Sequence, residues 1–123
     1  MPQLHLHGRL WLTLDGKNFL GRGRVELLER IHATGSISQA ARAMRMSYKA
    51  AWDAVDAMGN AWGRPLVASA TGGKGGGGTQ LTKDAETLIA AFRRWEAEHR
   101  RFLENLAHTG PLPTDGDKSA ARS

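Results

Sequence analysis

Residues 36–58 have the sequence SISQAARAMRMSYKAAWDAVDAM, and two helix starts lie within this stretch. Ser36 is followed three residues later by Gln39, a capping box that predicts a short helix over residues 37–44. Ser47 is a favourable N-cap for a second helix. Helices joined by so short a turn must cross steeply, which is the geometry of the helix-turn-helix motif.

The turn between these helices consists of Arg45 and Met46. A glycine often stands in such a turn, so we expect Arg45 to adopt the left-handed conformation, at a cost on the order of 1 kcal/mol. The small side chains of Ala40 and Ala41 let the two helices approach closely. The second helix is expected to run to about residue 60 and to enter the DNA major groove.

A further helix is predicted on the N-terminal side of this motif. Apolar residues at Val25, Leu28 and Ile31 recur with helical spacing from about Arg24 onward. Gly35 ends this helix, because glycine is the residue most often found just beyond a helix C-terminus.

The N-terminus itself predicts a β-hairpin. In LHLHGRLWLTL, residues 4–14, the leucines fall only on even positions, which is the period of a strand with one buried face. Asp15-Gly16 follows directly and is a strong two-residue hairpin signal. Residues 17–20 are therefore expected to return as the partner strand.

On the C-terminal side, the stretch ATGGKGGGGTQLT, residues 70–82, places six glycines around Lys74. A Walker-type phosphate loop needs Ser or Thr directly after the lysine, where this chain has Gly75. Strand-forming residues flank the run at 66–68 and 80–81, so we expect the glycines to form a hairpin loop. A hairpin that follows a helix-turn-helix is the wing of a winged helix.

A long C-terminal helix is expected after the N-cap Thr82, with Asp84 and Glu86 in its first turn, where the helix dipole favours acidic residues. About 25 residues at 1.5 Å each give about 37 Å, more than a small winged helix needs. We predict that the distal half pairs with the same helix of a second copy; the alternative is folding against the N-terminal hairpin of its own chain. The candidate dimerisation residues are Phe92, Trp95, Phe102, Leu103 and Leu106.

Together these elements predict a mainly α fold with a small β component: a winged helix-turn-helix with an N-terminal β-hairpin and a long C-terminal dimerisation helix. A chain of 123 residues suits one domain. We expect residues 1–108 to form this DNA-binding domain, dimerisation helix included. Residues 109–123 are expected to be a disordered tail, because they show no periodicity.

The composition limits the classes of function. The chain has no cysteine, which excludes disulfides and thiolate metal sites. It has no apolar run of about 18 residues and no signal peptide, so we expect no membrane association and a cytoplasmic location. The net charge of +5 indicates a polyanionic partner. Residues 36–83 hold six lysines and arginines against two aspartates, so the positive charge is concentrated there.

Catalysis and cofactor binding are not expected. His5 and His7 share one face of the predicted strand, but no third metal ligand is indicated nearby, so we predict no metal site. No nucleophile, base and orienting group occur at usable spacing. We therefore predict that the protein is not an enzyme and carries no cofactor.

The segments GSISQAARAMRMSYKAAWDAVDAM and ATGGKGGGGTQLT together resemble the N-terminal DNA-binding domain of the molybdate-responsive transcription regulators, the ModE type. That domain is distantly related to LysR-type helix-turn-helix domains. The resemblance covers about residues 20–107 and implies a winged helix that dimerises and binds palindromic operator DNA. In this family molybdate is sensed by separate C-terminal β-domains, which we do not expect in this chain. A separate protein could then sense the effector, and the sequence does not identify that partner.

The predicted function is a sequence-specific DNA-binding transcription regulator linked to molybdate or other oxyanion or metal homeostasis. It is expected to bind double-stranded palindromic operators as a homodimer. The alternative is a protein-interaction module that keeps the winged-helix fold and does not bind DNA. The charge of residues 36–83 and the intact SYK and GGKGGGG segments favour DNA binding.

The second helix of the motif supplies the candidate base contacts. Tyr48 and Lys49 lie in its first turn, where recognition helices face base edges or phosphates. Ser47 caps the helix and could also contact a phosphate. Trp52 either contacts DNA or closes the core between this helix and the wing, with the core position favoured. Asp53 either accepts from a cytosine amino group or orients Lys49 one turn earlier.

Phosphate contacts are expected on the surface around this helix. In the wing, glycines let the main chain approach phosphates and offer N–H donors, while the lysine adds a cation. The alternatives are a flexible loop without contacts for the wing and ordinary surface charges for the arginines. The candidate residues are Arg42, Arg45, Lys74, Gly75, Gly76 and Lys83.

Overall fold

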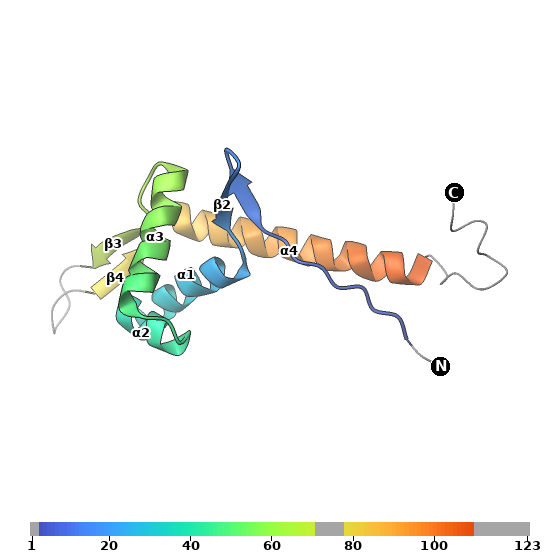
Figure 1. Ribbon diagram of the computed structural model, residues 1–123, viewed down its shortest axis with the longest axis horizontal. Helices are drawn as coiled ribbons and strands as arrows, with labels where there is room; N and C mark the ends of the chain where they lie inside the picture. Colours follow the sequence, from blue (N-terminus) through green and yellow to red (C-terminus); the bar gives the residue numbers. More distant parts are fainter. Residues whose placement is uncertain (1–2, 71–77, 110–123) are drawn as a thin grey trace.

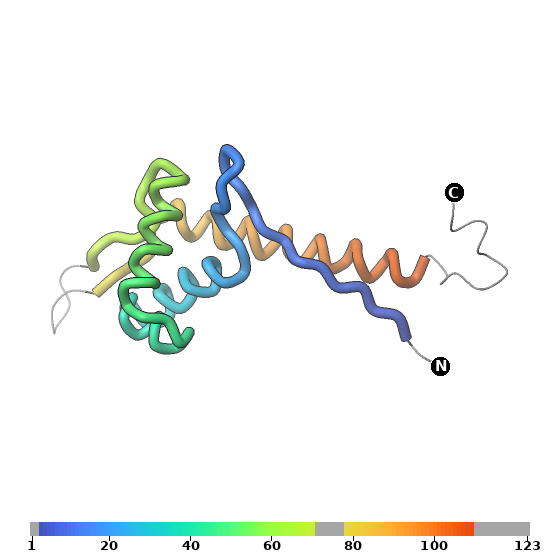
Figure 2. The backbone as a smooth tube through the Cα atoms, in the orientation of Figure 1, coloured from blue at the N-terminus to red at the C-terminus, as the bar shows by residue number. Residues whose placement is uncertain are grey.

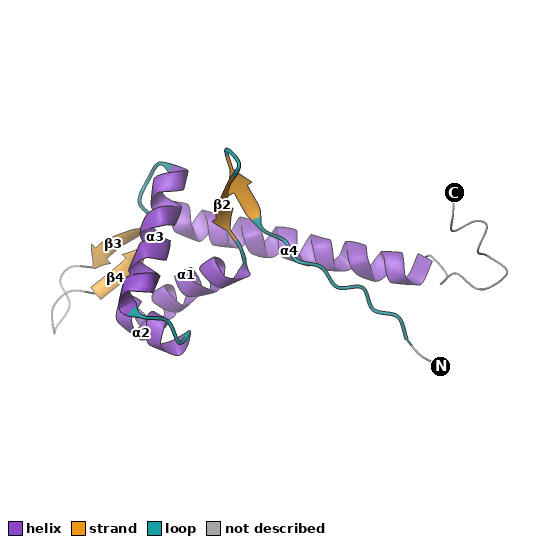
Figure 3. Cartoon of the chain, in the orientation of Figure 1, coloured by secondary structure: helices purple, strands orange, loops and turns teal. Residues whose placement is uncertain are grey.

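The computed structural model describes residues 3–70 and 78–109. This part of the chain contains four helices and two antiparallel β-hairpins (Figure 1, Figure 3). It confirms the predicted mainly α fold, a winged helix-turn-helix with a long C-terminal helix. In chain order the elements are β1 (Leu12–Leu14), β2 (Lys17–Leu20), α1 (Arg22–Thr34), α2 (Ile37–Ala43), α3 (Tyr48–Trp62), β3 (Val67–Ala70), β4 (Gly78–Leu81) and α4 (Lys83–Thr109).

Both caps predicted for the helix-turn-helix are present. The Ser36 hydroxyl accepts a hydrogen bond from the backbone N–H of Gln39 at 3.1 Å. The Ser47 hydroxyl accepts one from the backbone N–H of Ala50 at 3.0 Å. Arg45 lies in the left-handed region with φ 57°, as the missing turn glycine required. The two helix starts and the turn therefore follow from local chemistry.

Helix α1 lies at the centre of the fold. Its residues Val25, Leu27, Leu28 and Ile31 are buried, and it packs against α2, α3, α4, β2 and β4. Full burial of an aliphatic side chain contributes roughly 1.5–3 kcal/mol, so this helix supplies a large share of the core energy. The surrounding elements complete the core with Phe19, Leu20, Ile37, Ala40, Ala41, Ala51, Val55, Met58, Ala85, Leu88 and Phe92.

An aromatic contact closes the core where α3 ends. The ring of Trp62 stacks on Phe19 of β2, with 5.8 Å between centroids and 8° between planes. The indole N–H of Trp62 donates to the Asp84 carboxylate at 2.7 Å, and Arg64 pairs with the same carboxylate at 2.8 Å. Asp84 thereby holds the start of α4 against the end of α3.

The wing strands are fixed to the helix-turn-helix through the backbone. β3 pairs antiparallel with β4 from Val67–Leu81 to Ala70–Gly78, so the hairpin is longer than predicted. The N–H of Thr79 donates to the carbonyl of Gly35 at 2.9 Å. Gly35 joins α1 to α2 with φ 71°, a conformation that suits glycine. The root of the wing is thus tied to the residue before the motif.

The predicted N-terminal strand over residues 4–14 is wrong for most of its length. Only Leu12–Leu14 form a strand, which pairs with Lys17–Leu20 across a turn with positive φ at Asp15 and Gly16. Residues 3–11, called here the N-terminal segment, run extended beside the distal half of α4 without a sheet partner (Figure 2). β2 has only four residues, so no strand is available to pair with the first leucines.

Helix α4 has 27 residues, about 40 Å at 1.5 Å each, and extends beyond the body of the domain (Figure 1). Its proximal half buries Ala85, Leu88 and Phe92. The prediction that Phe92 lies on a dimer surface is therefore wrong, because the core of its own chain covers this ring completely. The helix ends at Thr109; the rest of the predicted tail, residues 110–123, lies outside the described residues.

A network of ion pairs fixes α4 to α1. The Arg93 guanidinium binds both carboxylate oxygens of Glu29 and also pairs with Glu96 at 2.7 Å. Arg22 pairs with Glu96 at 3.2 Å. The hydrogen bond to Glu29 raises the pKa of Arg93 above its usual value. Burial works to raise the pKa of Glu96, but the hydrogen bonds and charges of Arg93 and Arg22 outweigh it, so the net pKa is lowered.

Replacing Gly78 with alanine should destabilise the fold. A Cβ at this position would lie 2.9 Å from the Gly35 carbonyl oxygen, so β4 must shift. We expect Gly78→Ala to lower the free energy of unfolding by about 1–3 kcal/mol in urea denaturation. Gly23→Ala is the matched control, because a Cβ there meets open space; it should be neutral or stabilise by up to about 1 kcal/mol. Equal effects of the two substitutions would contradict the tight contact.

The Glu96 network should make stability depend on pH. Since the folded-state pKa of Glu96 is lowered from its ordinary value of 4.5, its stabilising contribution is complete above that value. The contribution is lost as the pH falls below 4.5 and through the lowered pKa. We expect Glu96→Gln to reduce stability at pH 7 and to flatten its loss at acidic pH, measured by urea denaturation. Glu104→Gln, at an exposed position on the same helix, should leave the acid profile unchanged.

Candidate nucleic-acid interface

The start of α3 presents a polar and aromatic face to solvent. Ser47, Tyr48, Lys49, Trp52 and Asp53 are all exposed. For Tyr48 the exposed fraction is 53%, and for Trp52 it is 41%. The prediction that Trp52 closes the core is therefore wrong.

The exposure of Trp52 has a simple geometric cause. The inward face of α3 is already occupied by Ala51, Val55 and Met58, which are spaced four and three residues apart. Successive helix residues are turned by about 100°, so the residue after Ala51 points well away from this buried face. The predicted contact of Trp52 with DNA remains open.

Lys49 and Asp53 form an ion pair along this face. The Lys49 ammonium lies 2.7 Å from the Asp53 carboxylate, one helical turn later. This hydrogen bond, with the charge of Asp53, raises the pKa of Lys49. The structure therefore supports the second of the two roles considered for Asp53, in which the carboxylate orients Lys49.

Three further candidate cations lie on exposed positions near the recognition helix. Arg42 is in the last turn of α2, Arg45 is in the turn before α3, and Lys83 begins α4. None of the three forms an ion pair with another residue of 3–70 or 78–109. Their charges are thus available to an anionic partner. The predicted wing contacts Lys74, Gly75 and Gly76 lie outside the described residues.

The elements of this interface gather at one end of the molecule. Figure 1 shows α2, the start of α3 and the wing strands at the end opposite to the distal half of α4. The distal half of α4 and the N-terminal segment occupy the other end. The chain therefore presents two separate surfaces.

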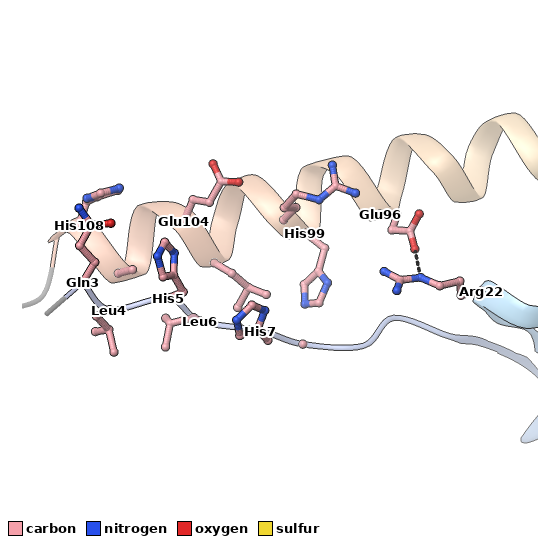
Figure 4. Close-up of a pocket in the computed structure, with 14 residues that line it drawn as sticks. Gln3, Leu4, His5, Leu6, His7, Arg22, Glu96, His99, Glu104 and His108 are labelled. Carbon is pink, nitrogen blue, oxygen red and sulfur yellow. Dashed lines mark hydrogen bonds and ion pairs between the residues drawn. The ribbon is translucent and has the colours of Figure 1, made fainter.

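The second surface is a groove between the N-terminal segment and α4, with a volume of about 530 Å³ (Figure 4). His5, His7 and His99 lie along it, and the Arg22–Glu96 ion pair closes one end. A Cβ at Gly8 would lie 3.2 Å from the Leu103 side chain, so the segment contacts α4 closely there. Within residues 3–70 and 78–109, no three His, Cys, Asp or Glu side chains are placed to hold a metal ion.

The N-terminal segment covers only part of the apolar surface of α4. Leu103 is half-buried, but the predicted dimerisation residues Trp95, Phe102 and Leu106 remain exposed. The alternative, in which the chain's own N-terminus hides these aromatic residues, is thus not what the structure shows. Sequence reasoning missed that the segment leaves apolar side chains of its own exposed. They are Leu4, Leu6 and Trp11.

None of the described helices combines the length and apolar character needed to cross a membrane. The polar recognition face, the free cations and the apolar distal helix are instead the features that a regulatory helix-turn-helix protein displays. Residues 23–86 match the model described as "Bacterial regulatory helix-turn-helix protein, lysR family".

The chain belongs to this lysR family. The match begins in α1 and ends in the first turn of α4, so it includes the helix-turn-helix and the wing. It confirms the expected LysR-like helix-turn-helix. The chain thus carries the helix-turn-helix region of this family of bacterial regulatory proteins.

Individual relatives confirm the resemblance to ModE-type regulators. The chain is 42% identical over 112 residues to the molybdenum transport protein ModE of Azotobacter vinelandii. It is 51% identical over 87 residues to the molybdenum-pterin-binding protein MopB of Rhodobacter capsulatus. It is 39% identical over 104 residues to the DNA-binding transcriptional dual regulator ModE of Escherichia coli (strain K12).

These matches cover most of this chain but less than half of each relative. They cover 91%, 71% and 85% of this chain, respectively. They cover only 42%, 32% and 40% of the relatives. The chain therefore spans less than half the length of the curated relatives it matches.

Proposed function

We propose that this protein binds palindromic operator DNA sequence-specifically as a homodimer. The main support for this proposal is that the first turns of α3 are exposed and belong to a helix-turn-helix. A recognition helix places its N-terminal residues on base edges in the major groove. Here these residues are Tyr48 and Lys49, followed one turn later by Trp52 and Asp53.

Phosphate contacts supply much of the proposed affinity. Arg42 and Arg45 come shortly before the start of α3, and Lys83 directly follows the wing strand β4 and its connecting residue Thr82. Lys74 adds a cation between the two wing strands in the sequence, with Gly75 and Gly76 beside it. Such contacts orient a protein on the duplex and carry no base information themselves. Base selection then falls to the exposed face of α3.

The dimer is proposed to form through the distal half of α4. Phe102 is 59% exposed, Trp95 42% and Leu106 44%. Full burial of an exposed side chain of this size contributes roughly 1.5–3 kcal/mol, and covering these half-exposed ones contributes about half of that, so this surface favours an apolar partner. A two-fold interface needs only one self-complementary patch, and the same patch on a second copy provides it. Two recognition helices about 34 Å apart would then match a palindrome.

The link to molybdate is proposed from the relatives. Molybdenum stands in the names of ModE of Azotobacter vinelandii and MopB of Rhodobacter capsulatus. We propose that the regulated genes serve the homeostasis of molybdate or another oxyanion, in the bacterial cytoplasm. Because the matches cover at most 42% of these relatives, the sensing of the oxyanion is not assigned to the described residues.

The affinity for DNA should come mainly from electrostatic contacts with phosphates and should depend on the wing. Each phosphate contact that is lost lowers the slope of log affinity against log salt by about 0.9. We expect Lys74→Ala and Lys83→Ala each to weaken operator and random duplexes alike and to reduce this slope by about one, measured by fluorescence anisotropy. Lys17→Ala, an exposed lysine on the N-terminal hairpin, should leave the slope unchanged.

The wild-type titration also separates the two candidate functions. A protein-interaction module with a winged-helix fold predicts no salt-dependent binding to any duplex. Such a result would falsify the DNA-binding proposal for this chain.

The proposed dimer should dissociate when charge is placed on the distal half of α4. We expect wild-type protein to sediment as a dimer at micromolar concentration and Phe102→Glu with Leu106→Glu to sediment as a monomer. Both side chains are exposed, so the double variant should keep the fold of the single chain. Trp52→Glu is the control, because Trp52 has an exposure close to that of Leu106 but lies on α3. A monomeric wild type would end the dimer proposal.

A further inference from the structure

The recognition helix carries two exposed aromatic side chains that the fold does not use. Tyr48 and Trp52 are the only large hydrophobic side chains exposed by the described residues outside the N-terminal segment and α4. They lie four residues apart, on the same side of α3. Both side chains belong to the part of the helix that faces the major groove in the proposed complex.

Neither ring is needed for the core. Ala51, Val55 and Met58 form the buried face of α3, and neither Tyr48 nor Trp52 belongs to the core cluster. Trp52 is one of the residues that line an open groove between α3 and the start of β3. Large apolar side chains gathered on a binding surface indicate an apolar contact with the partner.

The neighbouring side chains are polar and already paired. Lys49 and Asp53 follow Tyr48 and Trp52 by one position each and form the 2.7 Å ion pair. The exposed face of α3 therefore has two columns, one aromatic and one charged. Lys49 and Asp53 already use part of their hydrogen-bonding capacity on each other. The two aromatic rings have no partner in the described part of the fold, so they are the side chains of this face most available to the bases.

Thymine is the base whose major-groove edge suits an aromatic contact. Its C5-methyl group is the apolar feature that the major groove displays among the four base pairs, while cytosine presents an amino donor beside an unsubstituted C5. One helical turn is 5.4 Å and one base step is about 3.4 Å, so the two rings reach base pairs one or two steps apart.

We propose that the rings of Tyr48 and Trp52 contact the 5-methyl groups of two thymines in each operator half-site. This inference rests on the proposed DNA-binding function and names the base feature that α3 recognises. Each ring covers one methyl group and removes it from water. The two thymines lie on base pairs one or two steps apart, and they can be on either strand.

Deoxyuridine substitution tests the contact, because it removes only the methyl group. The probe is a duplex that the full chain itself enriches from random sequence, with each thymine of one half-site replaced in turn by deoxyuridine. Burial of one methyl group corresponds to roughly a fourfold change in affinity. We expect two positions in the half-site at which deoxyuridine weakens wild-type binding about fourfold.

Protein variants assign each methyl group to its ring. In Tyr48→Ala, deoxyuridine should leave the affinity unchanged at one of the two positions and lower it about fourfold at the other. Trp52→Ala should show the opposite assignment of the two positions. Tyr48→Phe keeps the ring without the hydroxyl and should retain the full sensitivity. The far-UV circular dichroism and thermal unfolding of each variant should match wild type, because neither ring belongs to the core.

The outcomes separate this inference from the function on which it rests. A chain that enriches no duplex overturns both. A chain that enriches an operator whose affinity is insensitive to deoxyuridine overturns the thymine contact and leaves sequence-specific binding intact. Loss of sensitivity in Tyr48→Phe also overturns it, because the hydroxyl rather than the ring would then read the base.

Discussion

The burial of α1 is the constraint on which the other elements depend. Val25, Leu27, Leu28 and Ile31 have at most 1% of their surface exposed, and α1 packs against the other three helices and one strand from each hairpin. No second core exists in the described part of the chain, so the elements that pack on this helix are oriented by that contact, and β1 and β3 follow their partner strands. Gly35 extends the constraint, because it ends α1 and accepts the hydrogen bond that fixes the wing.

Helix α4 connects the two ends of the molecule. Its proximal half is part of the core, and the Arg93 guanidinium joins it to Glu29 of α1. Its distal half carries exposed Trp95, Phe102 and Leu106. A continuous helix fixed in this way is stiff, so a two-fold contact at the distal end would set the distance between two recognition helices. The geometry of the proposed dimer is thus linked to the spacing of its operator half-sites.

Local signals in the sequence predicted the helix-turn-helix correctly, and the resemblance to ModE-type regulators predicted the family. Ser36 and Ser47 cap the predicted helices, and Arg45 adopts the predicted left-handed conformation. Burial was predicted less well. Trp52 was favoured as a core residue and is exposed, while Phe92 was expected on an interface and lies in the core. The alternating leucines before Leu12 predicted a strand that has no partner.

The correct and the incorrect predictions differ in the sequence distance between the residues that decide them. Caps, turns and helix starts depend on residues within about four positions of one another, so the sequence by itself determined them. Burial and strand pairing depend on which distant segments reach a given surface. Only the tertiary structure decided that the core covers Phe92, that β2 is too short to pair with the first leucines, and that the N-terminal segment covers Leu103 but not Phe102. The close fit of Gly78 beneath Gly35, 43 positions earlier, is of the same kind, because packing at the core rather than local sequence brings the two backbones together.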